Sequence, residues 1–298
     1  MEHKTYKNCK LCARVCGVDR GISTGFCRMG DNPVISRAAL HFWEEPPISG
    51  TRGSGTIFFT GCSLGCVFCQ NRRISSGEQG KEVTAERLSE IMLDLKEQGA
   101  HNINLVTPTH FVPSIKEAIT IARDKGLNLP IVYNTGSYDT KETIDSLDGF
   151  VDVYLPDLKY YLSKTAEKYS HAPDYPEVAR AAIDRMVKQV GAPIFDSDGI
   201  MKKGVIVRLL LLPGHVAEAK LSLKYLLDTY GDTVYVSLMN QYTPMEGMSA
   251  PLNRTVSREE YRSLLEYADH IGLVNGFTQE FGTAKESFIP DFDLTGVE

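Results

Sequence analysis

Short apolar runs alternate with amphipathic segments along most of this sequence, and this alternation limits the possible folds more than any other feature. Six runs are predicted to be strands because they are apolar or β-branched and end at turn residues. They lie at 56–60, 103–106, 129–133, 151–155, 205–212 and 234–238. Segments with one apolar face at helical spacing lie at 84–99, 113–125, 140–147, 176–190, 217–230 and 257–271. Buried strands that alternate with helices predict an α/β fold with a helix-covered parallel sheet.

The residues themselves leave two arrangements of this sheet open. One is an open, doubly wound sheet, and the other is a full or partial barrel. Six strand–helix units are fewer than the eight of a closed barrel, and 298 residues suffice for either arrangement. In both, reactive groups lie at the carboxyl ends of the strands. Functional residues are therefore expected at those ends.

The composition of the chain argues against several classes of protein. Hydrophobic residues make up 42% and charged residues 23%, as in a globular protein with a full core. The 32 basic and 38 acidic residues give a net charge of −6, which argues against a nucleic-acid ligand. No apolar run approaches the roughly 18 residues that span a bilayer, and residues 1–8 lack the apolar stretch of a signal peptide. We therefore expect a cytoplasmic protein that does not enter the membrane.

Seven cysteines fall into two groups. Four of them are Cys9, Cys12, Cys16 and Cys27, and the other three are Cys62, Cys66 and Cys69. An odd number cannot form a complete set of disulfides, and clustered cysteines in a reducing compartment are typical of metal sites. We expect residues 1–50 to form a small cysteine-rich metal-binding extension and residues 51–298 to form the α/β domain.

The second group has the spacing C-x3-C-x2-C and directly follows the first predicted strand. Phe68 stands just before its last cysteine, Cys69. Three thiolates on one short loop can hold three irons of a [4Fe–4S] cluster and leave the fourth iron without a protein ligand. A structural zinc site would need a fourth ligand, and no other cysteine or histidine is near in sequence. The spacing therefore predicts a cluster with one open iron.

This motif resembles the hallmark of the radical S-adenosylmethionine (SAM) superfamily, and the resemblance extends over about residues 55–280. Within the superfamily, the chain most resembles the pyruvate formate-lyase-activating-enzyme-like branch, here with an N-terminal four-cysteine cluster. The resemblance implies a partial (β/α)6 barrel and a [4Fe–4S] cluster whose open iron binds SAM. It also implies an oxidoreductase that reductively cleaves SAM to a 5′-deoxyadenosyl radical for hydrogen abstraction. No catalytic side chain is assigned, because the cofactor carries this chemistry.

The resemblance leaves the substrate open. One candidate is the backbone glycine of a glycyl radical enzyme, and the alternative is another protein, peptide or metabolite. A low-potential electron donor such as flavodoxin or ferredoxin is the expected redox partner. Two alternative interpretations assign the chain to other functional classes. One is a non-enzymatic iron–sulfur electron carrier, and the other is a zinc-binding interaction module on an inert barrel.

Seven polar residues in or directly after the predicted strands are candidates for binding SAM. They are Thr107, Thr109, Asn134, Asp157, Lys159, Arg208 and Asn240. Lys159 can pair with the SAM carboxylate as a point charge, and Asp157 can accept from the ribose or hold a cation. Arg208 lies in an apolar strand, where an unpaired charge is costly. It is therefore expected to face the SAM carboxylate or Asp157.

The other four candidates depend on position within the resembling family. Thr107 and Thr109 stand where relatives carry a glycine-rich loop beside the SAM amino group. Asn134 replaces the aspartate of an Asp-Thr-Asn-Gly loop, and Asn240 is placed to bond the adenine edge. His110 after the second strand is expected either to contact substrate or to cap the next helix.

Cys9, Cys12, Cys16 and Cys27 supply four thiolates, which is a closed ligand set. Tetrahedral zinc and a fully ligated second [4Fe–4S] cluster both fit four thiolates. Zinc would make this site a structural staple, whereas a second cluster could pass electrons to the first.

Overall fold

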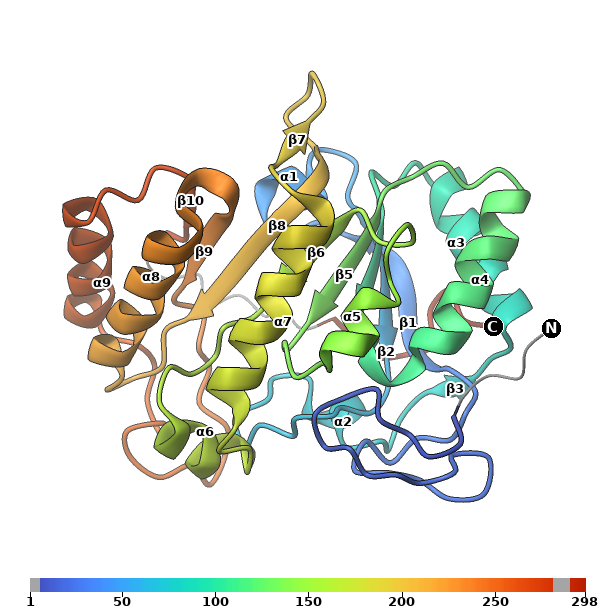
Figure 1. The fold of residues 1–298 in the computed structure, drawn as a ribbon, viewed down its shortest axis with the longest axis horizontal. Helices are drawn as coiled ribbons and strands as arrows, with labels where there is room; N and C mark the ends of the chain where they lie inside the picture. Colours follow the sequence, from blue (N-terminus) through green and yellow to red (C-terminus); the bar gives the residue numbers. More distant parts are fainter. Residues whose placement is uncertain (1–5, 281–289) are drawn as a thin grey trace.

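The computed structural model describes residues 6–280 and 290–298 (Figure 1). Its strands are β1 Val34–His41, β2 Ser54–Phe59, β3 Lys81–Glu82, β4 Ile103–Val106, β5 Ile131–Thr135, β6 Val153–Pro156, β7 Ile194–Phe195, β8 Met201–Leu210, β9 Tyr235–Met239 and β10 Gly276–Thr278. Its α-helices are α1 Pro46–Ser49, α2 Arg72–Ser75, α3 Ala85–Glu97, α4 Val112–Asp124, α5 Lys141–Asp145, α6 Ser163–Ser170, α7 Tyr175–Val190, α8 Val216–Tyr230 and α9 Arg258–His270. Two short 3-10 helices are η1 Thr109–Phe111 and η2 Gly231–Thr233.

The sheet is wound in one direction only. Its parallel strands neighbour one another in chain order, β2-β4-β5-β6-β8-β9-β10, and β1 and β3 continue it antiparallel beyond β2. A doubly wound sheet would reverse its strand order at a switch point. Within the described ranges, β2 and β10 are not paired, so the barrel does not close. This confirms the predicted α/β partial barrel, and each of the six predicted strands is present.

Two apolar layers flank the strands, because alternate side chains point to opposite faces. Figure 1 shows α3, α4, α5, α7 and α8 on one face of the sheet. Buried side chains of these helices, such as Ile91, Ile119 and Ile183, pack there against the sheet. The opposite, inner face carries a smaller apolar cluster of Ile48, Val132, Val153, Leu155, Met201 and Ile206.

Helix α1 closes the amino-terminal end of the barrel. Its Ile48 is fully buried in the inner cluster. The Ile48 carbonyl accepts a hydrogen bond of 2.7 Å from Asn102, which directly precedes β4. Ile48 thus closes the amino-terminal end of the barrel with an apolar side chain. The interior of the barrel opens at the carboxyl ends of the strands.

Residues 6–50 include both the cysteine-bearing segment and a strand of the sheet, whereas the expected division placed all of residues 1–50 outside the α/β domain. Strand β1 lies in this segment and pairs with β2 from Ile35 to His41. The cysteine-bearing part up to residue 33 lies outside the sheet, at the carboxyl end of the strands (Figure 1). The backbones of Cys12 and Asp139 form an isolated antiparallel β-bridge there, and the amide of Ala13 donates to the Tyr138 carbonyl over 3.0 Å. Among the described residues, no helix is long and apolar enough to cross a membrane.

Helix α9 begins with a capping box, which gives a first testable prediction. Glu260 accepts from the amides of Ser257 and Gly214 and pairs with Arg254 at 2.7 Å. Arg254 and these amides lower the pKa of Glu260 to about 2. We expect Glu260→Gln to reduce the free energy of unfolding by about 1 kcal/mol at neutral pH, as for other helix caps.

The effect of Glu260→Gln should depend on pH. A carboxyl whose pKa is depressed by folding stabilises the protein above its unfolded pKa, and this contribution is lost as the pH falls through the folded value. The difference between wild type and variant should therefore shrink as the pH falls from neutral toward about 2. Urea unfolding at several pH values measures it, and a difference that is constant with pH would contradict this account.

Candidate functional site

One large cavity, of about 500 Å³, opens where the parallel strands end. The loop of Cys62, Cys66 and Cys69 lines one wall. The ends of β4, β5, β6, β8 and β9 line another, and the segment between β1 and α1 contributes a third. Six of the seven predicted SAM-binding residues line this cavity: Thr107, Thr109, Asn134, Asp157, Lys159 and Arg208. Topology therefore brings together residues that are far apart in sequence, at the position expected for an α/β site.

The cysteine loop is held by hydrogen bonds to its backbone and to its sulfur atoms. The amide of Val67 donates to the Tyr169 carbonyl over 2.9 Å. The Ser170 hydroxyl lies 3.0 Å from Cys66 Sγ and donates to it. Burial raises the pKa of Cys66, and burial with the neighbouring thiols raises the pKa of Cys69 to about 11. These thiols are therefore protonated without a metal, whereas iron binding requires thiolates and releases their protons.

Arg14 joins the N-terminal segment to this loop. Its guanidinium donates to the carbonyls of Ser63 and Leu64, both at 3.0 Å. It also donates to Ser170 at 2.9 Å and to His171 at 2.7 Å. The Arg14 guanidinium lies 3.9 Å from the centre of the Phe26 ring, a cation–π contact. Arg14 thus holds both the cysteine loop and the residue that donates to Cys66.

A charged network crosses the cavity and is centred on Arg208. Arg208 Nε lies 2.8 Å from Asp157 Oδ1, and Lys159 Nζ lies 2.5 Å from Asp157 Oδ2. Arg208 also donates to Asn134 Oδ1 at 2.6 Å and pairs with Glu44 at 3.5 Å. The sequence predicts that Arg208 faces either Asp157 or the carboxylate of SAM. The structure pairs it with Asp157 while it still lines the cavity.

The network fixes the charge states of its members. Burial alone would raise the pKa of Asp157, but Arg208 and Lys159 outweigh it and the pKa is lowered. Burial would lower the pKa of Lys159, but Asp157 outweighs it and the pKa is raised. Both groups are therefore ionised at neutral pH, and they present fixed charges to a ligand such as the amino acid part of SAM.

Two predicted residues differ in placement from the sequence-based expectation. Asn240 does not line the cavity, because Met239 and Gln241 on either side do, and its amide nitrogen is directed to the Glu280 carbonyl at 3.4 Å. His110 neither reaches the cavity nor caps a helix. Its Nε2 bonds the Thr60 carbonyl at 2.7 Å, and burial lowers its pKa to about 3.

Thr107 has a backbone conformation that its residue type rarely adopts. Its φ is 58°, in the left-handed region that β-branched residues avoid. Its amide donates to the Asn134 carbonyl over 2.9 Å, which holds the turn in place. Strain of this kind persists where surrounding structure fixes it and clusters at functional sites. Here it directs the backbone after β4 along the wall of the cavity.

Glu44 and Glu45 also line the cavity, although no pattern in the sequence marks them as functional residues. They precede two prolines and read as part of an exposed turn. Glu44 accepts from Asn104 at 3.0 Å and Asn134 at 3.3 Å, in addition to its pairing with Arg208. Glu45 is 7% exposed. The neighbouring sequence does not indicate that they line a cavity, because the residues that contact them lie on strands distant in sequence.

The four N-terminal cysteines lie in one folded segment. Cys9, Cys12 and Cys27 are buried and Cys16 is exposed. Burial, with the charges of Cys27 and Cys9, raises the pKa of Cys12 to about 12. These thiols are therefore close enough to influence one another. In residues 6–280 and 290–298, no three cysteine, histidine or acidic side chains converge on a point suited to a single metal ion.

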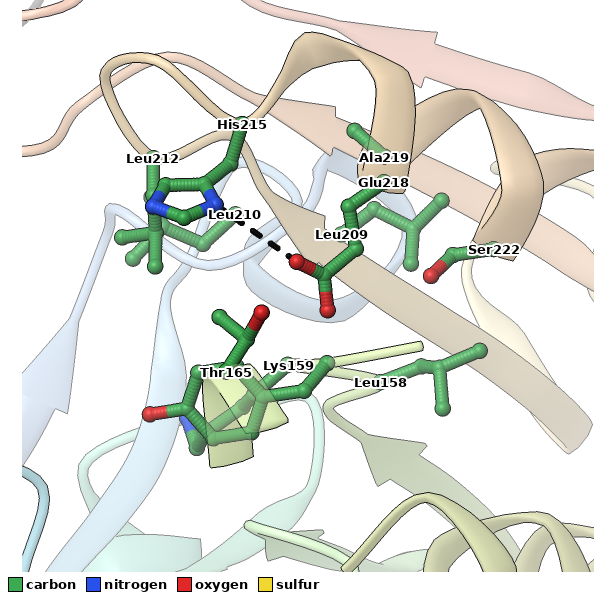
Figure 2. Close-up of a pocket in the computed structure, with 11 residues that line it drawn as sticks. Leu158, Lys159, Thr165, Leu209, Leu210, Leu212, His215, Glu218, Ala219 and Ser222 are labelled. Atoms are coloured by element: carbon green, nitrogen blue, oxygen red, sulfur yellow. Dashed lines mark ion pairs between the residues drawn. The ribbon is translucent and has the colours of Figure 1, made fainter. Parts of the chain in front are cut away.

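A second, much smaller hollow of about 20 Å³ lies between β8 and α8 (Figure 2). His215 Nδ1 lies 3.5 Å from Glu218 Oε2 there, the contact drawn as a dashed line. Glu218 also accepts from the amides of Tyr161 and Leu162 at 2.8 and 2.9 Å. The hollow holds at most about one water. This pair therefore anchors the loop after β6 to α8.

Comparison with known proteins identifies the family. Residues 56–215, which include the cysteine loop and four of the parallel strands that follow it, match the Radical SAM superfamily. The chain belongs to the radical SAM superfamily. A relative of this radical SAM chain is uncharacterized protein MJ0674 of Methanocaldococcus jannaschii, which is 31% identical over 279 residues. That match covers 90% of this chain and 76% of the relative.

Solved structures share the fold of this radical SAM chain. A radical SAM methyltransferase from Sphaerobacter thermophilus superposes with a TM-score of 0.53 at 17% identity, covering 76% of this chain and 66% of the other. SuiB of Streptococcus suis superposes with a TM-score of 0.51 at 14% identity, covering 77% of this chain. The chain spans about half the length of SuiB, since 49% of that protein is covered. At these identities, both likenesses concern the fold alone.

Membership of this family implies a [4Fe–4S] cluster and SAM, and the cavity fits both. Cys62, Cys66 and Cys69 all line its wall, beside the charges of Lys159 and Asp157. The fit extends to the donors around the sulfur atoms, since iron–sulfur clusters are tuned by such hydrogen bonds.

Arg14 gives a prediction for this cluster loop. Because charged hydrogen bonds contribute about 1.5–3 kcal/mol, we expect Arg14→Ala to reduce the free energy of unfolding by about 2 kcal/mol and to speed iron loss to a chelator. Arg14→Lys keeps the charge but loses the planar fork, so it should lie between the two. Arg28→Ala, which removes one exposed bond to the Ser76 carbonyl, is the control. Equal rates of iron loss in Arg14→Ala and Arg28→Ala would exclude this role.

Proposed function

We propose that this chain is an oxidoreductase that reductively cleaves SAM and takes a hydrogen atom from a protein or peptide substrate. The observation that carries the proposal is the cavity of about 500 Å³, which three cysteines line together with a fixed pattern of charges. When bound, the cluster supplies one electron that cleaves SAM to methionine and a 5′-deoxyadenosyl radical, which abstracts the hydrogen. The protein's own residues bind, orient and shield these groups.

Each group of residues has a role in this proposal. Cys62, Cys66 and Cys69 hold three irons, and Lys159 offers its ammonium to the SAM carboxylate. Asp157 keeps Lys159 charged and holds both Lys159 and Arg208 in position, through contacts of 2.5 and 2.8 Å. Thr107, Thr109 and Asn134 line the wall where the rest of SAM would lie. Asn240, which does not line the cavity, is the weakest of the candidates.

The substrate we favour is the backbone glycine of a glycyl radical enzyme, as in the pyruvate formate-lyase-activating-enzyme-like branch. A protein or peptide substrate has support from the fold, because SuiB has also been solved bound to the precursor peptide SuiA. That structure superposes with a TM-score of 0.52. Peptide modification of another kind is the second candidate function.

We further propose that Cys9, Cys12, Cys16 and Cys27 bind a second metal, either zinc or a [4Fe–4S] cluster. A low-potential donor such as flavodoxin or ferredoxin would reduce the protein. Analysis of iron, sulfide and zinc in anaerobically prepared wild type, followed by Cys9→Ser, distinguishes the two metals.

The proposed function is tested with the anaerobically reconstituted protein, dithionite and SAM. We expect 5′-deoxyadenosine to form, and addition of a glycyl radical enzyme should yield a glycine-centred radical in the electron paramagnetic resonance spectrum. Iron without any 5′-deoxyadenosine would overturn the enzyme proposal. Formation of 5′-deoxyadenosine without a glycine-centred radical would point to the second candidate.

A further inference from the structure

We propose that Glu45 binds a positively charged group of the substrate, an ammonium or a guanidinium, inside the cavity. This inference rests on the proposed function and deepens it, because it names the chemistry by which a substrate side chain would be recognised. It follows from the placement of Glu45, from the charges around it and from the residues beside it.

Glu45 occupies a helix-capping position but its side chain does not cap the helix. It directly precedes α1, and its carbonyl accepts from the amides of Ile48 and Ser49 at 2.8 and 3.1 Å. Its carboxylate instead extends into the barrel, where it lines the cavity and contacts Ser237 of β9. The residue is 7% exposed. A carboxylate buried there lacks the water that normally solvates it.

Glu45 is the carboxylate of this cavity whose partners are incomplete. Asp157 contacts both Lys159 and Arg208, and Glu44 contacts Arg208 and two asparagine amides. Among the described residues, Glu45 Oε2 finds no hydrogen-bond partner. The described wall of the cavity therefore carries three carboxylates but only two cationic side chains, Lys159 and Arg208. A ligand with one positive charge would balance the third carboxylate.

The protonation of Glu45 agrees with an incomplete site. Burial raises its pKa to about 6; Arg208 opposes this shift and Glu44 adds to it. A buried carboxyl is ionised most readily when a cation lies beside it. Arg208, the nearest cation named in this balance, is already engaged by Asp157, Asn134 and Glu44.

Two exposed aromatic residues stand next to Glu45 on the same wall. Phe42 is 51% exposed and Trp43 is 60% exposed, and both line the cavity. Aromatic faces attract ammonium and guanidinium groups, with about 0.5–2 kcal/mol per contact. A carboxylate behind an aromatic rim is thus suited to a lysine or arginine side chain of a peptide.

The intrinsic fluorescence of Trp43 can report ligand binding at this site. Trp43 is the single tryptophan of the chain, so a ligand that enters the cavity beside it should alter the intrinsic fluorescence. The probes are N-acetylarginine amide, N-acetyllysine amide and N-acetylcitrulline amide, the last a neutral counterpart of the arginine probe. They are titrated into the anaerobically reconstituted protein, with and without saturating SAM.

We expect the arginine or the lysine probe to change the fluorescence of Trp43 saturably, with the citrulline probe at least ~10-fold weaker. Glu45→Gln should weaken binding of the cationic probe at least ~10-fold, whereas Glu45→Asp should retain part of it. Glu97→Gln on the exposed face of α3 removes the same charge elsewhere and should bind as wild type. Circular dichroism verifies that each variant is folded.

Several results would overturn the inference. They are equal affinity for the arginine and citrulline probes, unchanged binding in folded Glu45→Gln, or no saturable response of wild type to either cationic probe. Loss of cationic binding whenever SAM is present would assign Glu45 to SAM and overturn it as well. Because 5′-deoxyadenosine is measured in the same preparation, its formation without cation binding would leave the proposed function standing. Its absence despite cation binding would reject the proposed function instead.

Discussion

Replacing Cys66 by alanine is expected to reduce 5′-deoxyadenosine formation to the level of a sample without enzyme. Three thiolates are the full set that this loop provides, so the variant leaves a second iron without a protein ligand. The measurements are the iron and sulfide content, the electron paramagnetic resonance spectrum of the reduced protein, and the amount of 5′-deoxyadenosine formed. The neighbouring Cys62 and Cys69 should behave alike, because all three line the same wall.

Ser170→Ala provides the matched comparison at the same place. It removes the 3.0 Å hydrogen bond to Cys66 Sγ but leaves the sulfur. We expect the cluster and SAM cleavage to persist, with a lower reduction potential, because the donor stabilises the more negative reduced state. Cleavage by Cys66→Ala at the wild-type rate would refute the assignment of this loop.

Replacing Arg208 by methionine should have the second-largest effect, on stability as well as on SAM binding. The change leaves Asp157 and Glu44 in the cavity without their shared cation. Removing one partner of a buried ion pair costs about 3–5 kcal/mol, and we expect a value near the lower end because Arg208 and Asp157 are 14% and 18% exposed. Urea unfolding measures this loss, and equilibrium dialysis measures SAM affinity.

Arg185→Met is the control for Arg208→Met. Arg185 pairs with Asp145 at 2.6 Å, with both side chains more than 40% exposed. An exposed pair contributes at most about 1 kcal/mol. Adding Glu44→Gln to Arg208→Met should restore part of the lost stability, since it removes a carboxylate that loses its pairing with Arg208, whereas Asp157 still pairs with Lys159. A smaller loss in Arg208→Met than in Arg185→Met would disprove the central place of Arg208 in the network.

Local sequence patterns were sufficient to predict the six strands β2, β4, β5, β6, β8 and β9 and the cysteine loop. Strand periodicity acts over a few residues, and the three cysteines stand on one short turn. The position of Asn240 could not be predicted, because a shift of one residue along a strand end reverses the face to which a side chain points. Gln241, the next residue, lines the cavity instead.

Contacts between distant segments explain what the sequence did not predict. Glu44 is 164 residues from Arg208, and the pair Glu44–Glu45 resembles a solvated turn until α1 brings it into the barrel. Arg14 and the carbonyl of His171 are 157 residues apart. The same applies to β1, which joins the sheet by pairing with β2 across the turn that contains α1.

The contacts of Arg14 have a consequence for the order of events during synthesis. The cysteine-rich N-terminal segment leaves the ribosome first, but Arg14 reaches all of its acceptors only after residue 171 has been made. Contacts of such long sequence separation form late in folding. The contacts of Arg14 with Ser63 and Leu64 can therefore form before those with Ser170 and His171, and its full set of hydrogen bonds requires the segment after β6.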